Sequence, residues 1–341
     1  MAFAVLPHPF LITGALAFAL AFVFTHFLIP FLARNGYVAV DLNKVPVGLS
    51  TAKIKELKEK GAKGLKTAPR SGGIAIVLGL LVACLFSLAY YPFAPEQLVV
   101  FLAALLSVSL ISTIGIVEDF LHIRQLYRVL LPAVAALPLM AVSAGTNSMT
   151  IPFLGTIDFG IYYALVLIPL GVVAASNLVN LLAGFNGLEA GVGVVVSVTL
   201  FSAAYLLGQP EAALLSVALG AACAAFLLFN WYPAKIFPGN SATYTIGAAI
   251  AAIVILGNME RIGFIALAPQ IAEFFLKATG KFRAENYGRV DKQGRLHYAG
   301  PTQSLSHVVM KTFKPTEQQL VAILLFVQLV FGALALASIG L

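Results

Sequence analysis

Residues Asn177 to Gly191 read NLVNLLAGFNGLEAG, and this stretch interrupts one of the most apolar regions of the chain. It contains three asparagines, one glutamate and three glycines between apolar segments at 160–179 and 189–208. Of the 341 residues, 60% are hydrophobic and 10% are charged, whereas a typical soluble domain has about 25% charged residues. Because such a chain cannot hide its apolar surface from water, we expect a membrane protein in which this stretch joins two spans.

The rest of the chain repeats this pattern of apolar segments joined by polar ones. A helical span needs about 20 mostly apolar residues. We expect an all-α polytopic membrane protein with about ten transmembrane helices in one domain, residues 1–341. The windows lie near 9–33, 72–92, 97–117, 129–144, 160–179, 189–208, 211–229, 242–257, 262–277 and 317–339. The first lacks a basic leading region, so we expect a retained span and not a cleaved signal peptide.

The basic residues indicate the orientation of these spans. Of the 21 Lys and Arg residues, only Arg261 falls on the side opposite the others. Since Lys and Arg accumulate on the cytoplasmic side, we expect both termini to be extracytoplasmic in a multi-pass protein of the cell membrane. The cytoplasmic loops are then about 35–71, 118–128, 180–188, 230–241 and 278–316.

Three connections have local structure of their own. NSMTIPFLGTIDFG has β-branched runs on both sides of Leu154-Gly155, which indicates a small hairpin. YGRVDKQGRLHY predicts a second hairpin that turns at Asp291–Gly294. STAKIKELKEKGAKG predicts a short basic helix between Ser50 and Gly61. Its lysines are expected to meet lipid phosphates, with no nucleic acid as partner.

Polar residues that are unusual for such a chain collect in the same cytoplasmic layer. Each has an ordinary explanation as a helix end, a cap, a charge marker or a close-packed glycine. Together, carboxylate and amide oxygens provide ligands for Mg²⁺, basic groups can bind phosphates, and glycines allow close approach of the backbone. This combination indicates phosphoryl transfer to a lipid. The layer contains Arg70, Glu118, Asp119, Arg128, Asn177, Asn180, Asn186, Glu189, Asn230, Lys235, Asn240 and Arg283.

The motifs at these residues resemble those of polyprenyl-phosphate N-acetylhexosamine-1-phosphate transferases. NLVNLLAGFNGLEAG is similar to N-x-x-N-x-L-A-G-x-N-G-L-E-A-G, and FNWYPAKIFPGN to N-W-Y-P-[SA]-[RK]-[VI]-F-x-G-D. GIVEDFLHIRQLYRVLLP is similar to G-[FI]-x-D-D-x-L-x-[LI]-R-x-x-x-K-x-x-L-P. The likeness extends from Arg70 to about His307. It favours the eukaryotic and archaeal UDP-GlcNAc:dolichyl-phosphate GlcNAc-1-phosphate transferases, which are related to phospho-MurNAc-pentapeptide translocase.

The resemblance implies an Mg²⁺-dependent enzyme, with Mn²⁺ as a possible substitute. It would transfer sugar-1-phosphate, most simply GlcNAc-1-phosphate, from a UDP-sugar to a polyprenyl or dolichyl phosphate and release UMP, as a first membrane step of glycan assembly. Relatives are often dimers, so a homodimer is possible. The implied roles are catalysis for Glu118, Asp119 and Arg128; metal binding for Asn180 and Asn240; and substrate binding for Asn186 and Arg283. The polar layer itself adds Arg70, Asn177, Glu189 and Lys235 as candidates for substrate binding.

Two substitutions depart from the family pattern at the expected reaction centre. Glu118 replaces an Asp, and Asn240 replaces the Asp that supplies a charged metal ligand. Arg128 stands where the family usually has a Lys. We expect the lipid phosphate to attack the β-phosphorus directly, with Glu118 or Asp119 orienting or deprotonating it; a covalent aspartyl route is the minor alternative. A catalytically weakened binding homologue, or a transporter or flippase, are the competing functions.

Overall fold

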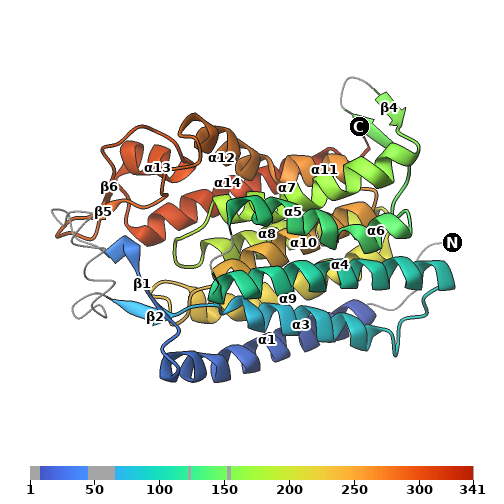
Figure 1. Ribbon diagram of the computed structural model, residues 1–341, viewed down its shortest axis with the longest axis horizontal. Coiled ribbons are helices and arrows are strands. Elements are labelled where there is room, and N and C mark those ends of the chain that lie inside the picture. Colours follow the sequence, from blue (N-terminus) through green and yellow to red (C-terminus); the bar gives the residue numbers. More distant parts are fainter. Residues whose placement is uncertain (1–7, 45–65, 122–123, 152–154, 341) are drawn as a thin grey trace.

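The computed structural model describes residues 8–44, 66–121, 124–151 and 155–340 and shows a mostly helical, polytopic membrane protein (Figure 1). All ten predicted windows are helical in the described part of the chain. The predicted basic helix between Ser50 and Gly61 lies outside the described residues. Helix α1 begins and α14 ends at the same end of the bundle, opposite the β1–β2 and β5–β6 hairpins (Figure 1).

Among the described residues, seven helices are long and apolar enough to cross a bilayer. In one of them, a π-helical turn, Tyr163–Leu167, precedes α7. The seven are α1 His8–Arg34, α4 Pro95–Phe120, α7 Ile168–Leu181 with its preceding turn, α8 Leu188–Leu206, α9 Pro210–Asn230, α10 Gly239–Leu256 and α14 Glu317–Ala337.

The other three predicted windows are shorter or broken. α3 spans Gly73–Ser87, and the fourth window divides into α5 Gln125–Ala135 and α6 Leu137–Ala141. The ninth window is a bent pair, α11 Glu260–Ala266 and α12 Ala268–Thr279, with 60° between them. Length and composition therefore support seven spans, or eight with the bent pair, in the described chain.

Two buried glutamines satisfy the backbone at the bend between α11 and α12. Pro269 at the start of α12 has no N–H to donate. The side chain of Gln328 on α14 donates to the carbonyl of Ala266 at 2.7 Å, and Gln270 donates to the Gln328 side chain at 2.7 Å. Because lipid offers no hydrogen bonds to a broken helix, these contacts stabilise the bend.

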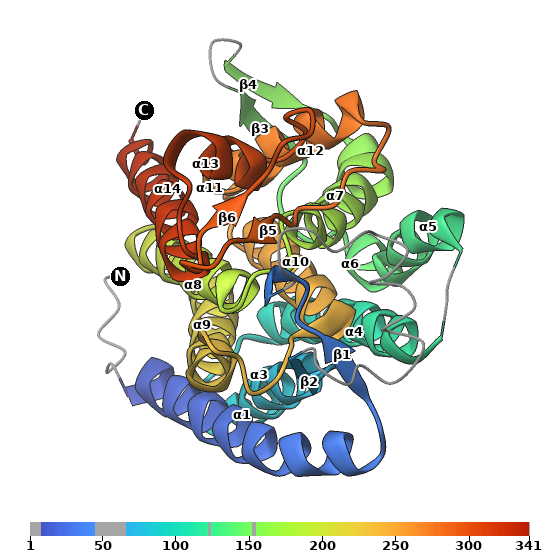
Figure 2. The ribbon, with the colours of Figure 1, turned by 90° about the vertical axis from the view of Figure 1, so that its left-hand side faces the viewer.

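Helix α10 is the centre of the bundle. It lies among α3, α4, α7, α8 and α9 (Figure 2). Small residues permit this packing: a β-carbon on Gly247 would lie 2.4 Å from the carbonyl oxygen of Ala175, and one on Gly73 would lie 2.1 Å from the backbone nitrogen of Ala242. Close backbone approach at glycine is typical of helix packing in membranes. The result is that the first turn of α10 meets the ends of α4 and α7.

Three antiparallel hairpins correct the expectation of an all-α fold. The two predicted hairpins are present, as β3 Ser148–Ile151 with β4 Gly155–Asp158, and β5 Arg289–Val290 with β6 Leu296–His297. The third was not predicted. It pairs β1 Val38–Val40 with β2 Thr67–Pro69, on both sides of the first long loop. A further short helix, α13 Leu305–Phe313, packs in the last loop.

Candidate active site

Asp119 joins α4 to the start of α10. Its Oδ1 accepts a hydrogen bond from the backbone N–H of Asn240 at 2.7 Å, and its Oδ2 accepts one from Ser241 at 3.1 Å. The first N–H groups of a helix have no partner within the helix, and a negative charge is favourable there. Gly239 has a φ of +74°, and a β-carbon on it would lie 2.4 Å from Oδ2 of Asp119. Asp119 is therefore a buried cap of α10, whatever its role in catalysis.

Glu118, its neighbour, has a different environment. Its carboxylate is buried, and its Oε1 lies 2.7 Å from Nε of Arg128, which is 40% exposed. The Tyr244 ring of α10 lies beside this pair. Neither oxygen of Glu118 has a well-aligned hydrogen bond among the described residues. Of the two adjacent acids, Glu118 is thus the one that pairs with a basic side chain, and its carboxylate, 1% exposed, is enclosed beside Arg128 and Tyr244.

Asn180 reaches the same place from α7. Its Oδ1 accepts a hydrogen bond from the Thr243 hydroxyl of α10 at 3.1 Å. Asn177, one turn earlier, donates to the carbonyl of Val173 at 2.8 Å, so part of its side chain serves its own helix. The structure thus brings together Glu118, Asp119, Arg128, Asn180 and the helix turn that carries Asn240. Asn177 lies one turn from this group.

A large cavity begins at two members of this group, Arg128 and Asn180. It has a volume of about 1070 Å³, and Arg128, Asn177, Asn180 and Tyr244 line one end of it. The walls are mostly apolar side chains from α7, α10, α11 and α12. Met149, Tyr163, Glu260 and Arg261 line it as well. A single cavity therefore connects a polar site to an apolar groove.

The loop from Leu182 to Gly187 adjoins this group, and side chains from distant segments hold its backbone. Two of the predicted substrate-binding residues take part: Glu189 bonds to the loop backbone, and Asn186 ties the loop to a distant side chain. Glu189 is buried and accepts a hydrogen bond from the N–H of Gly184 at 2.8 Å. Asn186 is 4% exposed, and its amide donates to Oδ2 of Asp41 at 3.2 Å. These contacts orient the loop, and the substrate contacts assigned to Glu189 and Asn186 stay predictions.

Three predicted basic residues lie at the surface. The side chains of Arg70, Lys235 and Arg283 are exposed. Among the described residues, no ion pair joins them to Glu118 or Asp119. Their assigned contacts with the substrate therefore stay predictions.

Several residues of the site were missed by reasoning from the sequence. Thr243 and Tyr244 interrupt an apolar helix, and Glu317 begins the last span, so their polarity was a visible signal. Asn43 and Asn286 lie in long loops with many polar neighbours and carried no such signal. Glu317 accepts a hydrogen bond from the N–H of Asn186 at 2.9 Å, and Asn43 donates to the carbonyl of Gly184 at 2.6 Å.

The donor set fits a hard cation. Among the described residues, no group of three His, Cys, Asp or Glu side chains could hold a metal, so amide oxygens are the protein ligands to consider here. Asn180 supplies such an oxygen where it lines the cavity, beside the Thr243 hydroxyl. Mg²⁺ keeps several waters and binds through one or two protein oxygens together with phosphates, and Mn²⁺ accepts similar ligands.

Comparison with known proteins finds similar sequences over most of the chain. Residues 101–258 match the model of "Glycosyl transferase family 4". A Sulfolobus acidocaldarius protein, provisionally named UDP-N-acetylglucosamine–dolichyl-phosphate N-acetylglucosaminephosphotransferase, is 33% identical over 328 residues, which cover 95% of this chain and 94% of that protein. A Saccharolobus solfataricus protein with the same provisional name is 39% identical over 78% of this chain and 83% of its own length.

A bacterial enzyme is also similar. The phospho-N-acetylmuramoyl-pentapeptide-transferase of Shouchella clausii is 31% identical over 309 residues, which cover 83% of this chain and 86% of that enzyme. The likeness therefore extends to relatives whose names give different sugar donors.

Proposed function

Because the chain belongs to glycosyl transferase family 4, whose members are polyprenyl-phosphate glycosyl-1-phosphate transferases, we propose that it transfers GlcNAc-1-phosphate from UDP-GlcNAc to a dolichyl-type polyprenyl phosphate. UMP is the second product. The provisional names of the archaeal relatives support this donor and acceptor. The reaction would be a first membrane step of glycan assembly.

One observation carries the proposal: the cavity that starts at Arg128, Asn177, Asn180 and Tyr244 continues as an apolar groove. A polyprenyl phosphate needs both parts, because its head is charged and its tail is hydrocarbon. Three of the residues that line the groove, Leu170, Phe264 and Phe275, are 60%, 67% and 64% exposed. The groove thus opens on the lipid-facing surface, where the tail of an acceptor can enter sideways.

The side chains at the polar end of the cavity have different roles in the proposed reaction. Among the described residues, Arg128 contacts a carboxylate only through Nε, so its two terminal amino groups can bind the acceptor phosphate. Glu118 holds the guanidinium in place and lies where it can orient or deprotonate the attacking phosphate. Asp119 fixes the first turn of α10, which carries Asn240 and Thr243. Thr243 in turn orients Asn180.

We propose Asn180 and Asn240 as the residues that would hold Mg²⁺, for which Mn²⁺ could substitute. Bound there, the cation would offset charge on the donor pyrophosphate as UMP leaves. Exposed Arg70, Lys235 and Arg283 would meet the soluble UDP-sugar at the rim. Asn186 and Glu189, held in the adjoining loop, are assigned to the nucleotide side.

The proposed arrangement in the membrane has ten crossings, with α3, α5–α6 and α11–α12 as the short or broken ones. The ends of the helical bundle support an even number of crossings, since α1 begins where α14 ends (Figure 1). With the basic loops in the cytoplasm, both termini are outside and the reaction takes place on the cytoplasmic face.

The test is UMP release by the purified chain with Mg²⁺, UDP-GlcNAc and a polyprenyl phosphate, with the lipid product identified by mass. Gly171 provides a matched variant in the groove. A β-carbon on it would meet no atom of the described residues within 4 Å, so Gly171→Leu adds volume to the groove without disturbing the fold. We expect it to slow reaction with a long acceptor more than with a two-isoprene one.

The control is Val198→Leu, at a lipid-facing position of α8 that is 59% exposed and does not line the groove. It should behave as the natural chain. No UMP release with any UDP-sugar, in natively folded protein, would reject a transferase and favour a binding homologue. Equal loss with both acceptors in Gly171→Leu would reject the groove as the tail site.

A further inference from the structure

The end of α7 is capped by a residue of the last cytoplasmic loop. The amide of Asn286 donates to the carbonyl of Leu181 at 2.9 Å and to that of Ala183 at 2.7 Å. The last four carbonyls of a helix have no partner within the helix, and Leu181 is the last residue of α7. Asn286 is 6% exposed. Both of its N–H bonds therefore serve the turn that follows Asn180.

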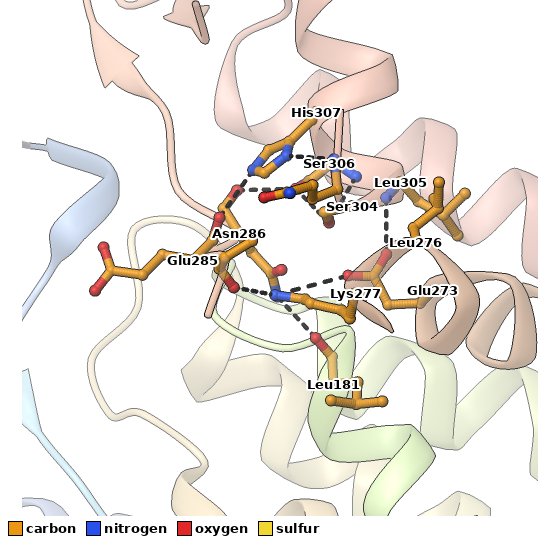
Figure 3. A network of polar contacts seen from close by, with 12 residues as sticks. Leu181, Glu273, Leu276, Lys277, Glu285, Asn286, Ser304, Leu305, Ser306 and His307 are labelled. Atoms are coloured by element: carbon orange, nitrogen blue, oxygen red, sulfur yellow. Dashed lines mark hydrogen bonds and ion pairs between the residues drawn. The ribbon is translucent and has the colours of Figure 1, made fainter. Parts of the chain in front are cut away.

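The segment that carries Asn286 is itself fixed at three successive carbonyls. Lys277 of α12 donates to the carbonyl of Ala284 at 2.6 Å, His307 of α13 to that of Glu285 at 2.8 Å, and the Ser306 hydroxyl to that of Asn286 at 2.8 Å. Figure 3 shows these side chains around the backbone of Glu285 and Asn286, while the Glu285 carboxylate points away from them. Loop backbone held in this way has little freedom to move.

The two helices that supply these donors are joined to each other. Glu273 of α12 accepts a hydrogen bond from the N–H of Leu305 at 2.7 Å, at the start of α13 (Figure 3). The Ser304 side chain caps the same turn. Glu273 also lies 3.9 Å from Lys277. The network is therefore a frame that extends from α12 and α13 to the amide of Asn286.

Tyr287 adds a packing contact beside this hydrogen-bonded one. A β-carbon on Gly184, whose φ is +112°, would lie 2.7 Å from the Tyr287 ring. Burial raises the pKa of Tyr287 to about 12, so the ring stays neutral. Asn286 and Tyr287, two consecutive residues of the last loop, thus contact the backbone that follows Asn180.

We propose that Asn286 is a positioning residue for the transfer reaction: by capping α7 it sets where the Asn180 carboxamide lies relative to Thr243 and the polar end of the cavity. This rests on the proposed function. The last loop would then act on the reaction through the backbone that it holds, and not only through exposed basic side chains such as Arg283. Misplacing a reacting or binding group by about 1 Å can reduce the rate roughly a hundredfold.

Asn286→Asp and Asn286→Ala test the proposal. The first keeps the size of the side chain but turns carboxylate oxygens toward the two carbonyls, and the second removes the donors. Asn35 is a matched control, because its amide also donates to a carbonyl near a helix end, that of Phe31 in α1, at 2.8 Å. No residue assigned to the reaction lies on α1, so Asn35→Ala should keep normal kinetics.

The first readout does not need activity. Hydrogen exchange of the amides at 182–188 should become at least about tenfold faster in both Asn286 variants, while the amides of α10 keep their protection. In kinetics we expect kcat to fall roughly ten- to a hundredfold and the Mg²⁺ midpoint to rise, with little change in the KM for the acceptor. Asn286→Gln, which restores the amide on a longer arm, should recover part of kcat.

Each outcome decides one point. Unchanged exchange at 182–188 would overturn the proposal, and so would faster exchange with normal kcat and Mg²⁺ midpoint. If the Asn286 variants yield less folded protein but each folded molecule keeps the normal kcat, Asn286 has only a structural role. If the natural chain releases no UMP but exchange responds as expected, the transfer function fails and the cap itself stands.

Discussion

The two halves of the candidate site are held in different ways. Glu118, Asp119, Asn180 and Thr243 lie on three packed helices, where glycine contacts decide which backbones meet. The other half, Leu182 to Gly187, is held by hydrogen bonds to its backbone. The donors and acceptors are side chains from five separate places: Asn43, Glu189, Asn230, Asn286 and Glu317.

This difference predicts different failures. A substitution in the helical half removes a reacting or binding group from a frame that stays in place. A substitution in the loop half leaves those groups present but moves them. Rates should therefore fall most in the helical half, and exchange or stability should change most in the loop half.

Asp119 should give the largest effect, because it belongs to the helical half yet also bonds to backbone. Asp119→Ala loses both an acid and the cap of α10, and we expect kcat to fall at least about 10³-fold. Asp119→Asn keeps one oxygen that can accept a bond from the first turn. If UMP release by Asp119→Asn is near normal, Asp119 is a cap alone and the assigned catalysis belongs to Glu118.

The Glu118–Arg128 pair should give the next largest effect. Both residues depart from the family pattern, and they touch at 2.7 Å. Glu118→Asp shortens one arm by a methylene, so the contact opens, and we expect a loss of roughly ten- to a hundredfold in kcat. Because contacting residues are energetically coupled, the Glu118→Asp, Arg128→Lys pair should lose less than the product of the single losses. Strict multiplication of the two losses in UMP release would show that the pair does not act as a unit.

Acidification should affect the loop half through His307. The N–H of Gln303 donates to Nδ1 of this ring at 3.2 Å, so the neutral ring carries its proton on Nε2 and donates to Glu285. Burial lowers the pKa of His307, and Lys277 and Lys311 act in the same direction. The unfolded chain thus takes up this proton first, near pH 6.5. Stability that is present above that pH is lost as the pH falls toward the folded-state pKa.

Thermal unfolding between pH 7.5 and 5 measures this effect. The natural chain should lose a few degrees of Tm on acidification, and His307→Gln, which cannot take up a proton, should lose less. Identical slopes for the two proteins would mean that His307 is not the group responsible.

Asn240→Asp should give the smallest effect. Position 240 lies in the first turn of α10, where a negative charge is favourable, so the fold should tolerate the change. A charged ligand strengthens binding of hard cations, and we expect the Mg²⁺ midpoint of UMP release to fall severalfold at unchanged kcat. A midpoint equal to that of the natural chain would place residue 240 away from the metal.

The sequence predicted most members of the helical half, though not Thr243, and none of their contacts. Glu118, Asp119, Asn180 and Asn240 stand at the ends of apolar windows, and all end up in one layer. That Asp119 would bond to the backbone while Glu118 faces Arg128 depends on the closeness of α4 and α10, which Gly239 permits. Propensity and hydropathy describe single segments and carry no information on that distance.

The loop half was predictable only in part. The glycines at 184 and 187 indicated an irregular turn, and both have positive φ. Its partners lie far away along the chain: Asn43 is 141 residues from Gly184, and Glu317 is 131 residues from Asn186. Among many polar loop residues, no local pattern marks the two that reach this turn. The broken ninth helix was similarly hidden: residues 262–277 were predicted as one span, and no local pattern indicates the buried glutamines that stabilise the bend.

The bend between α11 and α12 bears on which measure of acceptor concentration should control the rate. In the proposed arrangement the groove that it borders opens toward the bilayer, so an acceptor would reach Arg128 without its tail ever leaving hydrocarbon. Encounter is then two-dimensional. The rate should follow the mole fraction of acceptor among the surrounding lipids, and diluting the same vesicles with buffer should leave it unchanged while diluting the acceptor with phospholipid should lower it.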